Sequence, residues 1–181
     1  MKTDDREPGR SRATEVKGSY TFQYQFLNSE ETPGMDPHPN MNEGEFIKAI
    51  DEHFYFETDR EYEEIARMGC SISDNAALMV GYQLAIGSSH ASPEGNLGVL
   101  EILKQERPAP VVLAAIPVIK SLLNGEPVAQ EDTLRLLDAC RGHSNAWCGL
   151  GVVLCSDVSL EQECESIMAG WRSAENGGKD G

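Results

Sequence analysis

The sequence predicts a mainly α-helical protein, a compact multi-helix domain preceded by an N-terminal arm that forms an aromatic β-strand. From residue 42 onward, apolar residues recur three or four positions apart, and capping residues and glycines separate the segments. Before that point, residues 20–26 within the segment 19–27 alternate between aromatic and polar side chains. Alternation with a period of two is typical of a strand, because successive side chains point to opposite faces.

Composition divides the chain into four segments. Residues 1–18 are polar, and residues 173–181 hold Gly, Ser and charged side chains, so we predict a disordered tail at each end. Residues 19–41 combine the aromatic strand with a linker that contains three prolines. Residues 42–172 form the predicted helical domain. A length of 181 residues suits one ordinary hydrophobic core.

The first two helices have the same start signal. Asn42 and Thr58 are each followed three residues later by Glu, as in a capping box. They predict one helix over residues 42–56 and a second, short helix that ends at Gly69.

Serine caps mark the next two helices. Ser73 precedes a segment, up to residue 86, that is apolar on most sides, which predicts a central buried helix. Ser92 is followed by a proline at the first helical position and then by an acid, which is typical of a helix start. This fourth helix should end at "RPAP".

The segment 110–124 allows two interpretations. Its second half is predicted to be helical, ending at Asn124 and Gly125, but Pro117 would break or kink a helix that began earlier. Residues 111–116 could therefore be a short strand. The alternative fold class is α+β, in which residues 19–27, 111–116 and 150–155 form a small sheet.

The last third of the chain contains two clear helices and one ambiguous segment. Residues 131–140 and a segment from Ser159 to about Trp171 have helical patterns, the latter with Gln162 completing a capping box. In "NAWCGLGVVLCSD", two glycines oppose a helix and three consecutive apolar residues suit a strand, and we predict a helix.

The charge distribution is strongly acidic and uneven. The chain has 15 basic and 30 acidic residues, a formal net charge of −15, so a phosphate backbone would be repelled and nucleic acid is not an expected partner. Residues 28–67 carry twelve acids and three bases, whereas residues 1–17 are weakly basic. The acidity serves solubility or presents an acidic face to a basic partner.

Other features indicate a cytoplasmic protein without a membrane segment. No apolar run follows Met1, so export by a signal peptide is not expected. The longest apolar run, Ala109–Ile119, contains two prolines and is shorter than the roughly 20 residues that span a bilayer. An odd number of cysteines suits a reducing compartment better than a disulfide framework. They are Cys70, Cys140, Cys148, Cys155 and Cys164.

The candidate metal ligands are Cys140, His143, Cys148 and Cys155. They could hold zinc or iron, but their spacing lacks the C-x2-C pairs that typically bind one ion. Alternatively, one of the thiols could act as a nucleophile together with His143. The competing interpretation is that the cysteines pack as small apolar residues in the core. In that case the protein needs no cofactor.

Two further segments contain groups capable of chemistry. The stretch "DEHFYFETDREYEE" places His53, Glu57, Glu61 and Glu64 where one helix could gather metal ligands, although Thr58 indicates a helix boundary. A solvated acidic face is the simpler interpretation. In "IGSSHASPEGN", the helix start at Ser92 could receive an anion beside His90, or the segment is a plain loop.

The aromatic arm is the candidate binding element. One face of the predicted strand carries Tyr20, Phe22, Tyr24 and Phe26. A lone strand is unstable, so these rings must pack on the helical body, a second copy or another protein. The sequence therefore predicts a non-catalytic cytoplasmic accessory or adaptor protein, which binds a partner or itself through the arm and the acidic face of residues 43–64. The alternative is a metal-dependent or thiol enzyme that uses the Cys/His set.

Overall fold

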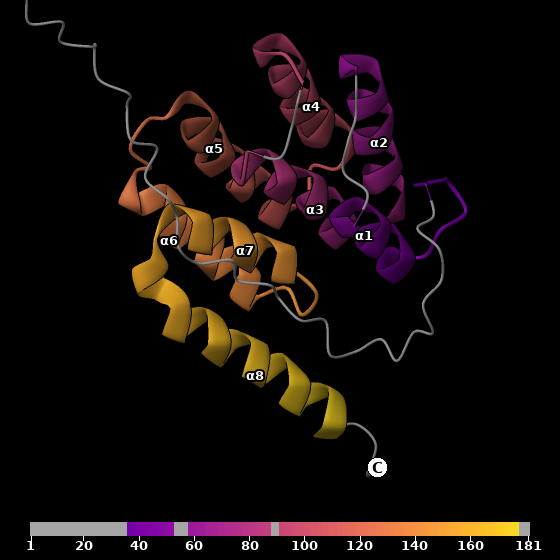
Figure 1. Cartoon of the computed structure of the whole chain (residues 1–181). Coiled ribbons are helices and arrows are strands. Elements are labelled where there is room, and N and C mark those ends of the chain that lie inside the picture. Colours follow the sequence, from indigo (N-terminus) through magenta and orange to yellow (C-terminus); the bar gives the residue numbers. More distant parts are fainter. Residues whose placement is uncertain (1–35, 53–57, 88–90, 178–181) are drawn as a thin grey trace, which may run out of the picture. The chain divides into compact units, whose positions relative to one another are not determined.

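The computed structural model describes residues 36–52, 58–87 and 91–177, and within these ranges it contains helices and no strand (Figure 1). The elements are α1 (Glu43–Glu52), α2 (Asp59–Ile72), α3 (Asp74–Ala85), α4 (Pro93–Glu106), α5 (Pro110–Asn124), α6 (Gln130–Arg141), α7 (Trp147–Ser156), the 3-10 helix η1 (Val158–Leu160) and α8 (Glu161–Gly177). Every described residue belongs to one compact unit, Pro33–Gly181. The mainly helical class is confirmed for these residues, whereas the arm at 19–27 lies outside them.

Helix α3 is central to the helical unit. It packs against α1, α2, α5 and α7 (Figure 1), and nine of its twelve residues are buried. A helix that is apolar on most sides must be covered on most sides, so the predicted central helix is confirmed. The hydroxyl of Tyr62 in α2 donates a hydrogen bond to the carbonyl of Val80 in α3, at 3.3 Å.

The capping boxes predicted at Asn42 and Thr58 are both present. The Asn42 side chain accepts from the Glu45 amide, and the Glu45 carboxylate accepts from the Asn42 amide, each at 3.0 Å. Thr58 and Glu61 make the same reciprocal pair at the start of α2. Helix α1 is described as far as Glu52, and the remainder of its predicted length, residues 53–56, lies outside the described residues.

Helix α5 corrects the expectation that Pro117 interrupts the segment. The helix runs unbroken from Pro110 to Asn124, with Pro117 inside it, and Gly125 ends it in the left-handed region at φ 66°. Its inner face buries four Val or Ile side chains, which contributes about 6 kcal/mol or more and exceeds the roughly 3 kcal/mol cost of an internal proline. Among the described helices, none is both long and apolar enough to cross a bilayer.

The ambiguous segment after Asn145 forms helix α7, as predicted. Residues 111–116 and 150–155 are both helical, so they do not form the small sheet of the alternative α+β fold. The two glycines of α7 face neighbouring side chains. A Cβ on Gly149 would lie 2.9 Å from Cys140 Sγ, and one on Gly151 would lie 3.0 Å from the Tyr82 ring. The glycines therefore allow close packing, which outweighs their low helix propensity.

The C-terminal helix begins and ends differently from the prediction. Asp157, rather than Ser159, supplies the cap, because its carboxylate accepts from the Ser159 amide at 2.9 Å and starts the short η1 helix. Helix α8 then continues to Gly177, through the first five residues of the predicted tail. It packs on α6, α7 and η1 and buries Cys164 and Ile167.

Candidate functional site

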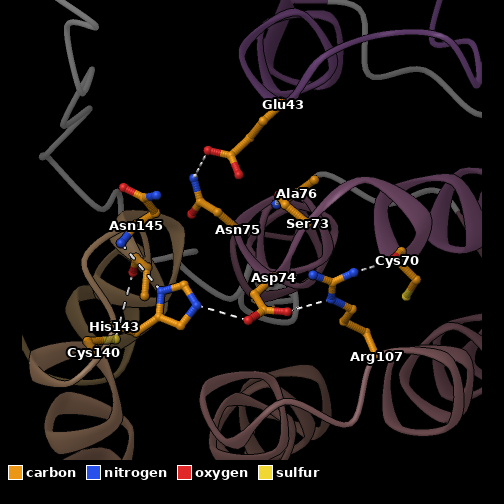
Figure 2. Close-up of polar contacts among 11 residues, drawn as sticks. Glu43, Cys70, Ser73, Asp74, Asn75, Ala76, Arg107, Cys140, His143 and Asn145 are labelled. Atoms are coloured by element: carbon orange, nitrogen blue, oxygen red, sulfur yellow. Dashed lines mark hydrogen bonds and ion pairs between the residues drawn. The ribbon is translucent and has the colours of Figure 1, made fainter.

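Asp74, the first residue of α3, lies at the centre of a polar cluster that joins four helix ends (Figure 2). One carboxylate oxygen accepts from Arg107 Nε, and the other lies 2.9 Å from His143 Nε2. Arg107 follows α4 and also donates from Nη1 to the carbonyl of Cys70 in α2, at 3.0 Å. His143 follows α6, so this cluster ties α2, α3, α4 and α6 together.

The contacts of His143 define its tautomer. The Asn145 amide donates to Nδ1 at 3.4 Å, which requires Nδ1 to be the unprotonated nitrogen, and Nε2–H then donates to Asp74. Both ring nitrogens therefore have partners within the chain. In this arrangement His143 holds two helix ends in place and offers neither nitrogen to a metal or to a thiol.

The charge of Asp74 is stabilised by its two partners. Burial of the carboxyl group by itself raises its pKa, but the hydrogen bonds from Arg107 and His143 and the positive charge of Arg107 outweigh that effect, so the pKa lies below the usual 3.8. The side chain of Asp74 is only 19 % exposed. A carboxylate that is ionised and held by two donors suits a structural role better than proton transfer near neutral pH.

Asn75, the next residue of α3, is buried and bridges two other helices. Its Oδ1 accepts from the Cys148 amide at 3.0 Å. Its Nδ2 donates to Glu43 Oε1 at 3.4 Å (Figure 2). The residue before α7, Ala146, makes no side-chain cap. Asn75 therefore satisfies an amide in the first turn of α7 from a position 73 residues earlier in the chain.

The predicted thiol residues differ in burial. Cys140 in α6 and Cys148 in α7 are buried, with Cys140 Sγ 3.7 Å from the Ala146 carbonyl and Cys148 Sγ 3.8 Å from Met79 Sδ. Cys155 lies at the other end of α7 and is partly exposed. All five cysteines are free thiols.

Burial keeps these thiols protonated. It raises the pKa of Cys140 to about 12 and that of Cys155 to about 11, from the usual 9.0. Burial, followed by the negative charges of Glu43 and Asp51, raises the pKa of Cys148 well above 9.0. The thiolate is the form that attacks substrates and binds metals, so the surroundings of these residues disfavour both kinds of chemistry near pH 7.

The proposed ligands Cys140, His143, Cys148 and Cys155 are not assembled around a common point. Within residues 36–52, 58–87 and 91–177, no group of three or more His, Cys, Asp or Glu side chains could hold a metal ion. The His143 ring contacts Asp74, whereas the Cys140 thiol contacts the Ala146 carbonyl and the Cys148 thiol contacts Met79.

The acidic stretch after α1 is only partly described. His53 and Glu57 lie outside the described residues. Glu61 belongs to the capping box of Thr58, and Glu64 makes an exposed ion pair with Arg60 at 3.0 Å. Thr58 is the helix boundary that the sequence predicts, so Glu61 and Glu64 belong to α2.

The predicted anion site at the start of α4 holds a carboxylate from the same chain. Asp59 accepts from the Ser92 amide at 2.8 Å and from the Ser92 hydroxyl at 2.6 Å. Those hydrogen bonds lower the pKa of Asp59. A Cβ on Gly95 would clash with the Asp59 carboxylate, so the glycine makes room for this contact. His90 lies outside the described residues.

Sequence reasoning missed Asp74, Asn75 and Arg107. Asp74 contacts residues 33 and 69 positions away, and no local spacing reports such a contact. The aromatic residues of the arm, Tyr20, Phe22, Tyr24 and Phe26, lie outside the described residues.

Comparison of the chain with protein-family models, with curated proteins and with solved structures found no match.

Proposed function

We propose that the chain is a non-catalytic cytoplasmic accessory or adaptor protein that binds a protein partner, or a second copy of itself, through the aromatic arm and the acidic face of residues 43–64. The polar side chains that are best placed for chemistry support this proposal, because they already serve the fold. Asp74, Asn75 and Asp59 each hold the end of another helix.

The observation that carries the proposal is the exposed negative charge on α1 and α2. The exposed acids are Glu45, Asp51, Glu52, Glu61 and Glu64. Although Asp51 is exposed as a residue, partial burial of its carboxyl group, followed by the charge of Glu52, raises its pKa. A Lys or Arg from a partner would relieve this crowding of negative charge, and such charge complementarity speeds association and selects partners.

A basic peptide tests the acidic face. We expect an oligolysine of about ten residues to bind the full chain, with the largest amide shifts in α1 and α2, and binding should weaken as salt screens the charges. The variant Asp51→Asn/Glu52→Gln should bind the peptide more weakly than Glu163→Gln/Glu165→Gln. The second variant removes the same charge from two exposed acids of α8. Equal loss in both would contradict a specific acidic face.

A pair of arm variants tests the aromatic residues. Phe22→Ser/Phe26→Ser removes two rings from one face of the predicted strand, and each ring could stabilise a docked arm by roughly 2 to 3 kcal/mol. Gln23→Ser/Gln25→Ser alters the opposite face and is the control. Self-association should weaken, or apolar surface should become exposed, only in the first variant. If both variants match the wild type in stability and oligomer size, the arm does not bind in the isolated protein.

A further inference from the structure

Helix α8 differs from its neighbours in how little of it is buried. It lies at an edge of the helical unit and packs on α6, α7 and η1 (Figure 1). Of residues 161–175, Cys164 and Ile167 alone are buried, whereas six of the ten residues of α7 are buried. Most of the stability of a helix in a protein comes from packing of its apolar face, so α8 is held weakly.

Polar side-chain contacts connect other helices but not α8. The hydroxyl oxygens of Thr133 in α6 and Ser156 in α7 lie 3.3 Å apart, for example. In α8, Arg172 and Ser173 donate to carbonyls of the same helix. Within the part of the chain that the structure describes, no side-chain hydrogen bond or ion pair joins α8 to another helix. Helix α5 lacks such contacts too, but it packs on α3, α4, α6 and α7.

Two adjacent residues weaken the middle of α8. A Cβ on Gly170 would meet no neighbouring side chain within 4 Å. Unlike Gly149 and Gly151 of α7, this glycine therefore gains no close packing in exchange for its low helix propensity. Trp171 Nε1 is buried and has no hydrogen-bond partner among the described residues. A buried donor without an acceptor lowers the stability of the conformation that buries it.

We propose that α8 is a releasable cover, which opens as a unit from the surface of α6 and α7 while α1–α7 stay folded. Segments with few buried apolar contacts are the ones that open locally. The chain already breaks at Asp157, where α7 ends and the three-residue η1 begins. The central helix α3 packs on α1, α2, α5 and α7, so these contacts remain in the open state.

Opening of the cover changes the surface of the protein without unfolding its core. The closed state buries Cys164 and Ile167 beneath α8. The open state exposes these two side chains, together with the surface of α6 and α7 on which α8 packs. The fold therefore contains a second conformation that presents apolar surface while the Asp74 cluster stays intact.

Native-state hydrogen exchange of the full chain, followed by NMR at low urea concentrations, tests the cover. We expect the amides of residues 165–169 in α8 to exchange at least about tenfold faster than those of residues 78–84 in α3, after correction for intrinsic rates. Urea should change the α8 rates less than the α3 rates, because opening one helix exposes less surface than global unfolding.

Two isoleucines of equal burial provide matched variants. Ile167 in α8 and Ile102 in α4 are each 7 % exposed. Ile167→Val should speed exchange in α8 about two- to twelvefold, because the closed state loses a buried methylene group. Ile102→Val makes the same change in a helix that stays packed during the opening. It should leave α8 exchange within about twofold of wild type and speed exchange in α3.

Gly170→Ala tests the cover in the opposite direction. The added methyl group has room and favours the helix, so exchange in α8 should slow about two- to fivefold. This variant keeps the test decisive even if Ile167→Val fails to fold.

Three results would overturn the proposal. If Ile102→Val speeds α8 exchange as much as Ile167→Val does, α8 opens only when the whole domain unfolds. Wild-type α8 amides that exchange as slowly as those of α3 would lead to the same conclusion. If α8 exchange responds to neither Ile167→Val nor Gly170→Ala, its buried face is not released as a unit. The cover is independent of the binding proposed for the arm and the acidic face.

Discussion

Nε2 of His143 lies 2.9 Å from Oδ2 of Asp74, although 69 positions separate the two residues in the chain. Arg107 holds the other carboxylate oxygen, so a single side chain at the start of α3 receives donors from residues that follow α4 and α6. This polar cluster at the start of the central helix therefore connects helix ends, and we expect its removal to destabilise the fold.

Asp74→Asn should destabilise the fold by about 1 to 3 kcal/mol. Asn keeps the shape of the side chain but loses its charge, and its NH2 group would face either Arg107 or His143, where it cannot accept a hydrogen bond. Urea denaturation measures this loss. Asp138→Asn is the matched control, since Asp138 is 82 % exposed and pairs with Arg141 at the surface. We expect it to cost less than about 0.5 kcal/mol. Equal costs would mean that the Asp74 contacts contribute no more than an exposed ion pair.

Acid should lower the stability of the fold by protonating Asp74. The pKa of Asp74 in the folded state lies below the usual 3.8, so its contribution is present above pH 3.8 and is lost as the pH falls through the folded-state value. The urea midpoint should therefore drop less in Asp74→Asn than in the wild type between about pH 5 and about pH 2.5. Hydrogen bonds from Ser92 also lower the pKa of Asp59, so some acid sensitivity should remain in the variant. An unchanged pH profile would contradict this assignment.

Gly149→Ala should destabilise the protein by about 1 to 3 kcal/mol, because its Cβ would lie 2.9 Å from the buried Cys140 Sγ. Gly170→Ala in α8 has open space around it and should stabilise by about 0.5 to 1 kcal/mol through helix propensity. Thermal or urea melts of both variants measure the difference. Cys140→Ala should offset part of the Gly149→Ala cost by removing the atom that clashes, and purely additive effects would show that the two sites do not touch.

Thiol reagents should distinguish the cysteines by burial. Cys155 is partly exposed and should react first in the native protein, slowly because its pKa is about 11, whereas the four buried thiols should react only on unfolding. Titration with a disulfide reagent, with and without urea, measures these rates, and Cys155→Ser should remove the first phase.

Rapid native reaction of Cys148 would contradict this burial order. So would one equivalent of zinc or iron in the native protein that is lost in His143→Ala, since a metal site on Cys140, His143, Cys148 and Cys155 would then exist.

The sequence by itself determined the helical class, the capping boxes of α1 and α2 and the central position of α3, because these depend on residues within one or two turns of each other. Only the tertiary structure decided the fate of Pro117 and of the glycines in α7. Pro117 is tolerated because the inner face of α5 buries enough apolar area, and the α7 glycines are placed against Cys140 and Tyr82. The Asp74, Arg107 and His143 cluster depends on contacts across 33 and 69 positions. Local sequence patterns carry no information about such pairs, because these hydrogen bonds form only when packing of the core brings the helix ends together.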